Sequence, residues 1–180
     1  MSCMLKSIAS LFGIVKDGPK AGFFPMQRRA KEETGEGGKF EPQSFAGVLQ
    51  PIAAGKGEDD ETPYQILMRE VEEELGKPFA QILSQKNEND FFPLFEKEYI
   101  DKHEETVKNY NYFTVISNED LGKIELHSGA DPELVFLRKE DLGNIKTVKQ
   151  MEGKEIGSSD LVMFPDQLSA LRGAAEKIKK

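Results

Sequence analysis

The sequence predicts an α/β protein in which a mixed β-sheet carries helices on both faces. Three observations support this prediction. A strong amphipathic helical pattern lies near the middle of the chain, over residues 63–75, and a second one closes it, from Phe164 to Ile178. Runs with the alternating apolar pattern of strands lie before and after the first helix. Helices that flank strands in this way pack as layers around one core.

The first elements are two strands, Ile8 to Lys16 and Gly22 to Arg28. The turn sequence Lys16-Asp17-Gly18-Pro19 lies between them, so we expect a hairpin. Ile8 to Val15 is too short to span a membrane, and a hairpin is favoured over a signal peptide. Residues 31–43 are polar and rich in glycine, which predicts a loop, and the apolar stretch 44–54 follows.

The helix over 63–75 has clear signals at both ends. Thr62 precedes Pro63, as an N-cap precedes a proline at the first helical position. Gly76 is placed to end the helix, and Pro78 forbids its continuation. The apolar residues recur at helical spacing and form one stripe for a core, namely Tyr64, Leu67, Met68, Val71 and Leu75.

After this helix the pattern predicts strands at Phe91 to Ile100, Val107 to Ile116 and Leu134 to Leu137. The closing helix covers the other side of the sheet. Residues 141–160 have no pattern that assigns them. There is no internal repeat, and the length suits one domain, so residues 1–180 are interpreted as a single domain.

The opposite side of the helix is strongly acidic. Glu70, Glu73 and Glu74 stand at i, i+3 and i+4 and therefore share a face. Their mutual repulsion becomes favourable when a hard divalent cation that prefers oxygen ligands binds them. Arg69 precedes Glu73 by four residues and is placed to hold its carboxylate. Without further signals, a run of glutamates is most often a solvated face.

The flanking residues complete a longer pattern. The chain follows G-x5-E-x7-R-E-U-x-E-E-x-G-U, where U is a bulky apolar residue, and it departs only at the last position, which is Lys77. This pattern resembles the Nudix box, and the resemblance implies an α/β/α sandwich. Gln27-Arg28-Arg29 resembles a Q-R-R sequence frequent in that family. The fixed positions that match are Gly55, Glu61, Arg69, Glu70, Val71, Glu73, Glu74 and Gly76.

The resemblance also implies roles for these residues. Glu73 and Glu74 are the expected direct ligands of Mg²⁺, or of Mn²⁺, and Glu70 is a third ligand or the base that takes a proton from water. Glu61 would assist a second metal, and Arg69 would orient Glu73. Ala54 stands where the family often has glycine, and its carbonyl is an expected metal ligand. The residues expected to contact the substrate are Arg28, Arg29, Gly55 and Lys56.

Outside this motif the sequence is less informative. Glu133 is the first candidate for an additional catalytic carboxylate and Asp131 the second, beside the alternative of solvated loop charges. The two histidines, His103 and His127, are interpreted as surface residues. Four aromatic residues are candidates for stacking on a nucleobase or for the core, namely Phe40, Phe45, Tyr110 and Tyr112.

Composition narrows the function classes. The net charge of −8 disfavours a nucleic-acid partner, although a local basic patch of Lys20, Arg28, Arg29 and Lys31 leaves RNA decapping open. The single cysteine, Cys3, disfavours isopentenyl diphosphate isomerase chemistry and fits a reducing, cytoplasmic compartment.

The resemblance thus implies a metal-dependent hydrolase that cleaves the diphosphate linkage of a nucleoside diphosphate joined to another group, such as a nucleotide, a nucleotide sugar or ADP-ribose. The alternative from another class is a domain that senses nucleotides without catalysis. We expect no membrane association and allow for a homodimer.

Overall fold

The computed structural model describes residues 5–28, 47–58, 60–101, 103–127, 132–154, 156–157 and 159–177. The loop expected over 31–43 lies outside these residues, as do Cys3, Arg29, Lys31, Phe40, Phe45 and Asp131. The structure confirms the α/β class, with a mixed sheet and helices on both of its faces. Within the described ranges, no helix has both the length and the apolar character needed to cross a membrane.

The centre of the molecule is a five-stranded mixed sheet. β1 (Lys6–Val15) runs antiparallel to β4 (Ala53–Lys56) and parallel to β7 (Thr106–Ile116). β5 (Phe92–Pro93) and β6 (Lys97–Ile100) both pair with β7. Because β1 has a strand on each side and helices on each face, its C-terminal half is almost continuously buried rather than alternating.

A smaller antiparallel sheet contains β2 (Phe24–Arg28) between β3 (Leu49–Gln50) and β8 (Glu133–Leu137). The expected strand at Leu134 to Leu137 is therefore confirmed. The expected hairpin of the first two strands is wrong, because β1 and β2 join different sheets. The bonds from Val15 N to Phe23 O and from Gly22 N to Val15 O join the two strands at the turn. β4 pairs with the same edge of β1 from Ile8 to Leu11, so β2 diverges after the turn and pairs with β3 and β8.

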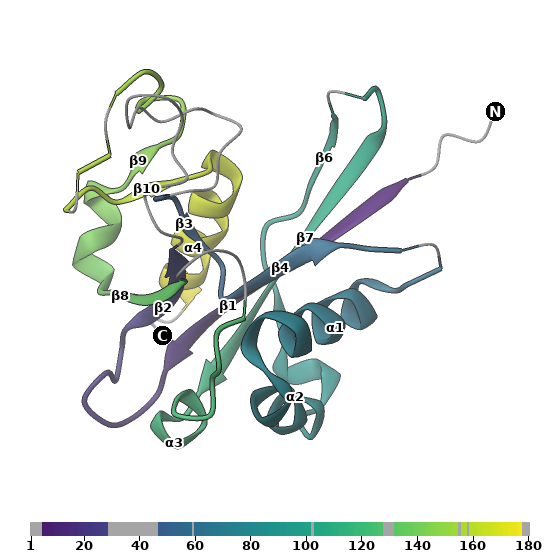
Figure 1. The fold of residues 1–180 in the computed structure, drawn as a ribbon, viewed down its shortest axis with the longest axis vertical. Helices are drawn as coiled ribbons and strands as arrows, with labels where there is room; N and C mark the ends of the chain where they lie inside the picture. The colour runs from purple at the N-terminus through teal and green to yellow at the C-terminus, as the bar shows by residue number, and fades with distance from the viewer. Residues whose placement is uncertain are drawn as a thin grey trace.

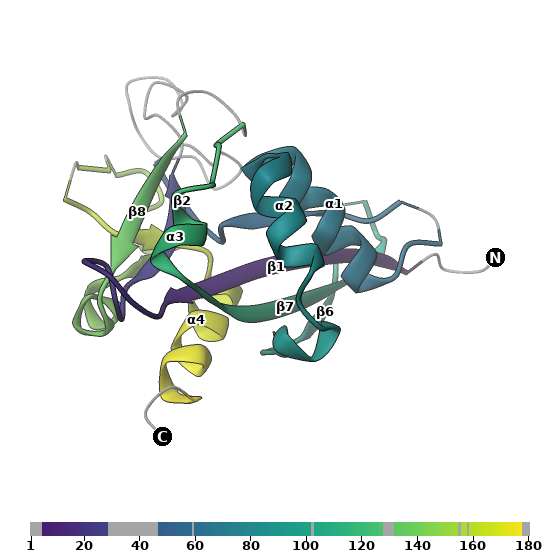
Figure 2. The same cartoon turned by 90° about the horizontal axis from the view of Figure 1, so that it is seen from below.

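Helices cover the central sheet on both faces (Figures 1 and 2). α1 (Pro63–Leu75) and α2 (Lys77–Ser84) pack on one face, over a core that includes Leu11, Leu67 and Phe79. The C-terminal helix α4 (Pro165–Lys177) packs on the other face, over a core that includes Phe12 and Phe113. The closing helix predicted from the sequence is thus confirmed.

Short elements complete the chain. The expected strand from Phe91 to Ile100 is only partly confirmed, because it is interrupted between β5 and β6 and its residues are largely exposed. Residues 141–160, for which the sequence predicted no structure, begin within a 3-10 helix and continue into the first strand of a two-stranded parallel sheet. The remaining elements are η3 (Glu88–Asp90), α3 (Asn118–Leu121), η4 (Lys139–Asn144), β9 (Lys146–Thr147) and β10 (Val162–Met163).

Candidate active site

The acidic helix α1 begins and ends as its sequence predicts. Thr62 Oγ1 accepts a hydrogen bond from Gln65 N at 3.2 Å, and Gln65 Oε1 accepts one from Thr62 N at 2.9 Å. This reciprocal capping satisfies backbone donors that an α-helix leaves open at its start. Gly76 ends the helix with φ +86°, a conformation that favours glycine. Pro78 does end α1, but it lies in the first turn of α2, a helix that the sequence analysis did not predict.

The end of α1 is held by a distant segment. Glu125 N donates to Leu75 O, and His127 N donates to Glu74 O, each at 2.9 Å. These bonds satisfy carbonyl groups that the helix itself leaves unpaired. The His127 side chain is 54% exposed, in line with the expected surface position, but its backbone fixes the turn that carries Glu74.

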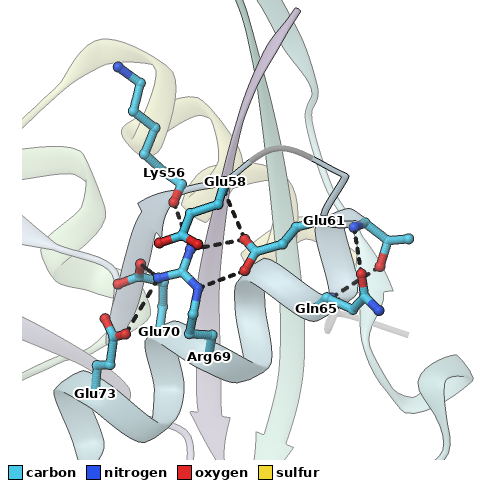
Figure 3. Close-up of polar contacts among 8 residues, drawn as sticks. Lys56, Glu58, Glu61, Gln65, Arg69, Glu70 and Glu73 are labelled. Atoms are coloured by element: carbon cyan, nitrogen blue, oxygen red, sulfur yellow. Dashed lines mark hydrogen bonds and ion pairs between the residues drawn. The ribbon is translucent and has the colours of Figure 1, made fainter.

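Arg69 is the centre of the polar cluster (Figure 3). Its Nε and Nη2 donate to the two carboxylate oxygens of Glu61 at 2.9 and 3.0 Å. Its Nη1 donates to Glu70 Oε1 at 2.8 Å, and its Nη2 also donates to the carbonyl of Lys56 at 2.8 Å. Glu73 lies farther from Arg69, at 3.5 Å. Arg69 therefore orients Glu61 and Glu70 first, whereas the sequence led us to expect Glu73.

The electrostatics of the cluster follow from these contacts. The hydrogen bond to Glu61 and the nearby carboxylates raise the pKa of the Arg69 guanidinium. The bond from Arg69, together with one from Glu58 N, lowers the pKa of Glu61. Burial raises the pKa of Glu70, and this effect outweighs the opposing charge of Arg69. Three carboxylates thus surround one cation, which leaves the cluster with an excess of negative charge.

Gly55 is required by the position of Glu70. Gly55 lies on β4, and a Cβ atom at this residue would stand 1.9 Å from Cδ of Glu70. Glu70 is 9% exposed, so its carboxylate has little room to withdraw. The sequence pattern marked both residues, and the structure shows that they are in direct contact.

Glu74 connects α1 to the same strand. Its Oε2 accepts a hydrogen bond from Ala54 N at 2.8 Å. The backbone of residues 54–56 is therefore contacted from α1 at three points, by Glu74, Glu70 and Arg69. The side-chain methyl of Ala54 does not prevent the hydrogen bond to Glu74, so alanine is compatible with this contact at the position where the family often has glycine.

Two further predicted site residues lie on the smaller sheet. Arg28 and Glu133 are paired across β2 and β8, and Nε and Nη2 of Arg28 lie 2.8 and 2.7 Å from Glu133 Oε1. Among the described residues, the Glu133 carboxylate bonds to Arg28 and not to the cluster around Arg69. Tyr112 packs against the core under α1, whereas the ring of Tyr110 faces Lys108 Nζ at 5.0 Å.

The carboxylates of this cluster are suitable ligands for a divalent cation, although most of them are bonded to other protein groups in this structure. Among the described residues, no three His, Cys, Asp or Glu side chains converge as a metal site. The carboxylates of Glu61 and Glu70 face Arg69, and that of Glu74 faces Ala54 N. Glu73 is 58% exposed and weakly held, so it is able to rotate. Oxygen ligands with excess negative charge are the chemistry that Mg²⁺ and Mn²⁺ prefer.

Comparison with solved structures identifies the fold. The chain is similar to a bifunctional NMN adenylyltransferase/ADP ribose pyrophosphatase from Francisella tularensis, solved with AMP and a Mn ion (15% identity, TM-score 0.56, covering 97% of this chain and 42% of that one). It is also similar to the NUDIX domain of Shewanella oneidensis NrtR in complex with ADP ribose (14% identity, TM-score 0.55, covering 99% of this chain and 90% of that one). A third similar structure is a C. elegans Ap4A hydrolase binary complex (11% identity, TM-score 0.51, covering 97% of each chain).

These likenesses show that the chain has the Nudix fold. No family model matches the sequence, and no curated protein matches it either. Because the identities are low, the likenesses carry the fold and not the activity or the substrate.

Proposed function

We propose that the protein is a metal-dependent hydrolase that cleaves the diphosphate linkage of a nucleoside diphosphate derivative. One observation carries the proposal. The carboxylates of Glu61, Glu70 and Glu73 surround the guanidinium of Arg69. Glu70 is also buried against Gly55 of β4. Such a concentration of carboxylates is unfavourable unless a further cation joins it. The structural neighbours solved with ADP ribose, or with AMP and a Mn ion, agree with this class of ligand.

Glu73 and Glu74 would hold a Mg²⁺ or Mn²⁺ ion, with Glu70 and the Ala54 carbonyl as further ligands. A bound divalent cation neutralises diphosphate oxygens and lowers the pKa of a bound water. Arg69 fixes Glu70 through Oε1, so Oε2 would serve either as a metal ligand or as the atom that accepts a proton from the attacking water. Gly55 keeps the strand close to this carboxylate.

Glu61 acts on this cluster by fixing the guanidinium with both of its oxygens. A role for Glu61 at a second metal, a catalytic role for Glu133 and substrate contacts by Arg28, Arg29 and Lys56 stay predictions. The same holds for a cytoplasmic location and for a homodimer.

The test is phosphate release from a panel of nucleoside triphosphates, nucleotide sugars, ADP-ribose, dinucleoside polyphosphates and capped RNA, with Mg²⁺ or Mn²⁺. Glu73→Gln and Glu74→Gln are measured beside Glu140→Gln, an exposed glutamate of η4. We expect turnover of at least one substrate, lost by several orders of magnitude in the first two variants only. Metal-dependent binding without turnover anywhere would contradict the proposal and favour the nucleotide-sensing alternative.

A further inference from the structure

An open groove of about 630 Å³ runs along the outer side of α1 and α2. Arg69 and Glu73 of the polar cluster line one side of it, and Lys77 and Gln81 of α2 line the other. Met68 and Ala80 contribute apolar surface. The groove is therefore continuous with the candidate active site, and a substrate held at Glu73 would have room to extend into it.

Lys77 is the unusual residue of this groove. It occupies the one position where the chain departs from the Nudix pattern, which has a bulky apolar residue there. The side chain is exposed, and within the described ranges no carboxylate oxygen lies within 4 Å of its ammonium. By contrast, Lys6 is already paired with Glu105, and Lys97 with Asp166.

The local fold explains why Lys77 faces the groove. The positive φ of Gly76 ends α1, and α2 begins at the next residue with Ala80 N donating to Gly76 O at 3.1 Å. Lys77 and Gln81 then stand at i and i+4, on one face of α2. A cation and a neutral hydrogen-bonding group are thus presented together beside Glu73.

The charges of the groove favour an anionic ligand once a metal ion balances the glutamates. Arg69 is occupied by Glu61 and Glu70, so its charge is largely neutralised inside the cluster. Lys77 is the cation of the groove that has no partner among the described residues. Glu72, also in the groove, opposes an anion.

We propose that this groove binds an anionic group of the substrate beyond the cleaved diphosphate linkage, and that Lys77 contacts that group. This inference rests on the proposed function and narrows its substrate class. The chain would prefer a nucleotide that ends in a charged phosphoryl group over one whose diphosphate ends in a neutral sugar. ATP and ADP-ribose represent these two classes.

The experiment measures kcat and KM of the full chain for both nucleotides, with Mg²⁺, in wild type and in Lys77→Leu, Glu72→Gln and Lys149→Leu. Leucine restores the apolar residue of the pattern, and Lys149 is an exposed lysine near β9 that serves as the charge-matched control. We expect Lys77→Leu to raise KM for ATP about fivefold, the size of one exposed charge interaction, and to leave ADP-ribose almost unchanged. Glu72→Gln should lower KM for ATP, and Lys149→Leu should change neither constant.

Equal effects of Lys77→Leu on both nucleotides, or none on either, would overturn the inference. Binding of ATP and ADP-ribose in the presence of Mn²⁺, measured by calorimetry, separates it from the proposed function. If no nucleotide is turned over but Lys77→Leu still weakens ATP binding selectively, the groove is confirmed and the hydrolase proposal fails. If turnover occurs and ATP binding does not depend on Lys77, the groove proposal alone fails.

Discussion

The two flanks of α1 carry the same residue type in very different settings. On the flank that faces the sheet, the side chain of Glu70 is 12% exposed, bonded to Arg69 at 2.8 Å and packed against Gly55. On the outer flank, the side chain of Glu73 is 58% exposed and lies 3.5 Å from the same arginine. One carboxylate is fixed by the fold, and the other is left to respond to a ligand.

This difference shows how one helix can combine rigidity with adaptability. The inner carboxylate is positioned before any ligand arrives, which reduces the cost of ordering it on binding. The outer carboxylate retains its conformational freedom and its solvation. If the two flanks differ in this way, substitutions on the inner flank will have larger effects than substitutions on the outer flank.

The largest effect is expected for Gly55→Ala. The new Cβ would occupy the position of the Glu70 carboxylate and displace it from Arg69. A displacement of about 1 Å in a catalytic group costs on the order of a hundredfold in rate, so kcat/KM should fall by at least that factor. The matched control is Gly57→Ala, whose Cβ would meet Ile66 Cδ1 at 2.4 Å instead. Gly57→Ala should lower Tm through overpacking yet reduce kcat/KM far less; similar losses of kcat/KM in both variants would contradict the inner-flank account.

The second effect concerns the arginine itself. Lysine at position 69 keeps the charge, but its three N–H donors cannot make the four hydrogen bonds that the guanidinium gives to Glu61, Glu70 and the Lys56 carbonyl. Loss of such a supporting contact typically costs about 10–100-fold in metal affinity or activity. Calorimetric titration of Arg69→Lys with Mn²⁺ and the kinetic constants measure this loss. Wild-type values would show that the fork of hydrogen bonds is not needed.

The third prediction is a pH dependence of stability in a metal-free, chelator-containing buffer. Because burial raises the pKa of Glu70 above that of the unfolded chain, its ionised form is disfavoured in the folded state. The contribution of protonated Glu70 to the free energy of unfolding is fully present below the ordinary glutamate pKa, and it is lost as pH rises through the raised pKa of the folded state. Glu70→Gln should therefore have a higher Tm than wild type near neutral pH. The difference should vanish below about pH 4. A lower Tm for Glu70→Gln near neutral pH would show that the Arg69 contact outweighs burial.

The smallest effect is expected for the pair on the outer flank. A double-mutant cycle of Arg69→Met and Glu73→Gln should give a coupling of about 0.3–0.5 kcal/mol, typical of an exposed i, i+4 pair. The corresponding cycle of Arg69→Met and Glu61→Gln should give a larger coupling energy, because Arg69 donates two hydrogen bonds to the Glu61 carboxylate. Denaturant unfolding without metal measures both. Equal couplings would show that the two hydrogen bonds from Arg69 to Glu61 contribute no more to stability than the exposed contact with Glu73.

Local signals in the sequence predicted most of the fold around the site. The cap at Thr62, the stop at Gly76 and the apolar stripe of α1 are short-range features, and the structure confirms each of them. α2 was not predicted from the sequence, because Pro78 indicates the end of α1, whereas proline also fits the first turn of a new helix. The groove in which Lys77 lies was not predicted for the same reason.

Long-range pairing was harder to predict. The turn between Val15 and Phe24 suggested a hairpin, but the strands separate because β4, about forty residues along the chain, pairs with the same edge of β1 from Ile8 to Leu11. The contact of His127 N with Glu74 O likewise joins residues far apart in the sequence. The partners of Arg69 were predicted from helical spacing, which favoured Glu73. Spacing along a helix cannot show that Glu61, eight residues earlier and outside the helix, reaches the guanidinium first.

The measurement that tests the central claim most directly is Mn²⁺ binding to the full chain, followed by electron paramagnetic resonance of the free ion. If the carboxylates of α1 hold a divalent cation, wild type will bind Mn²⁺ and Mg²⁺ will displace it. Glu74→Gln and Glu73→Gln will weaken binding by an order of magnitude or more, whereas Glu140→Gln will bind like wild type. Binding that is absent in wild type, or equal in all four proteins, would contradict the claim that this acidic helix is a metal site.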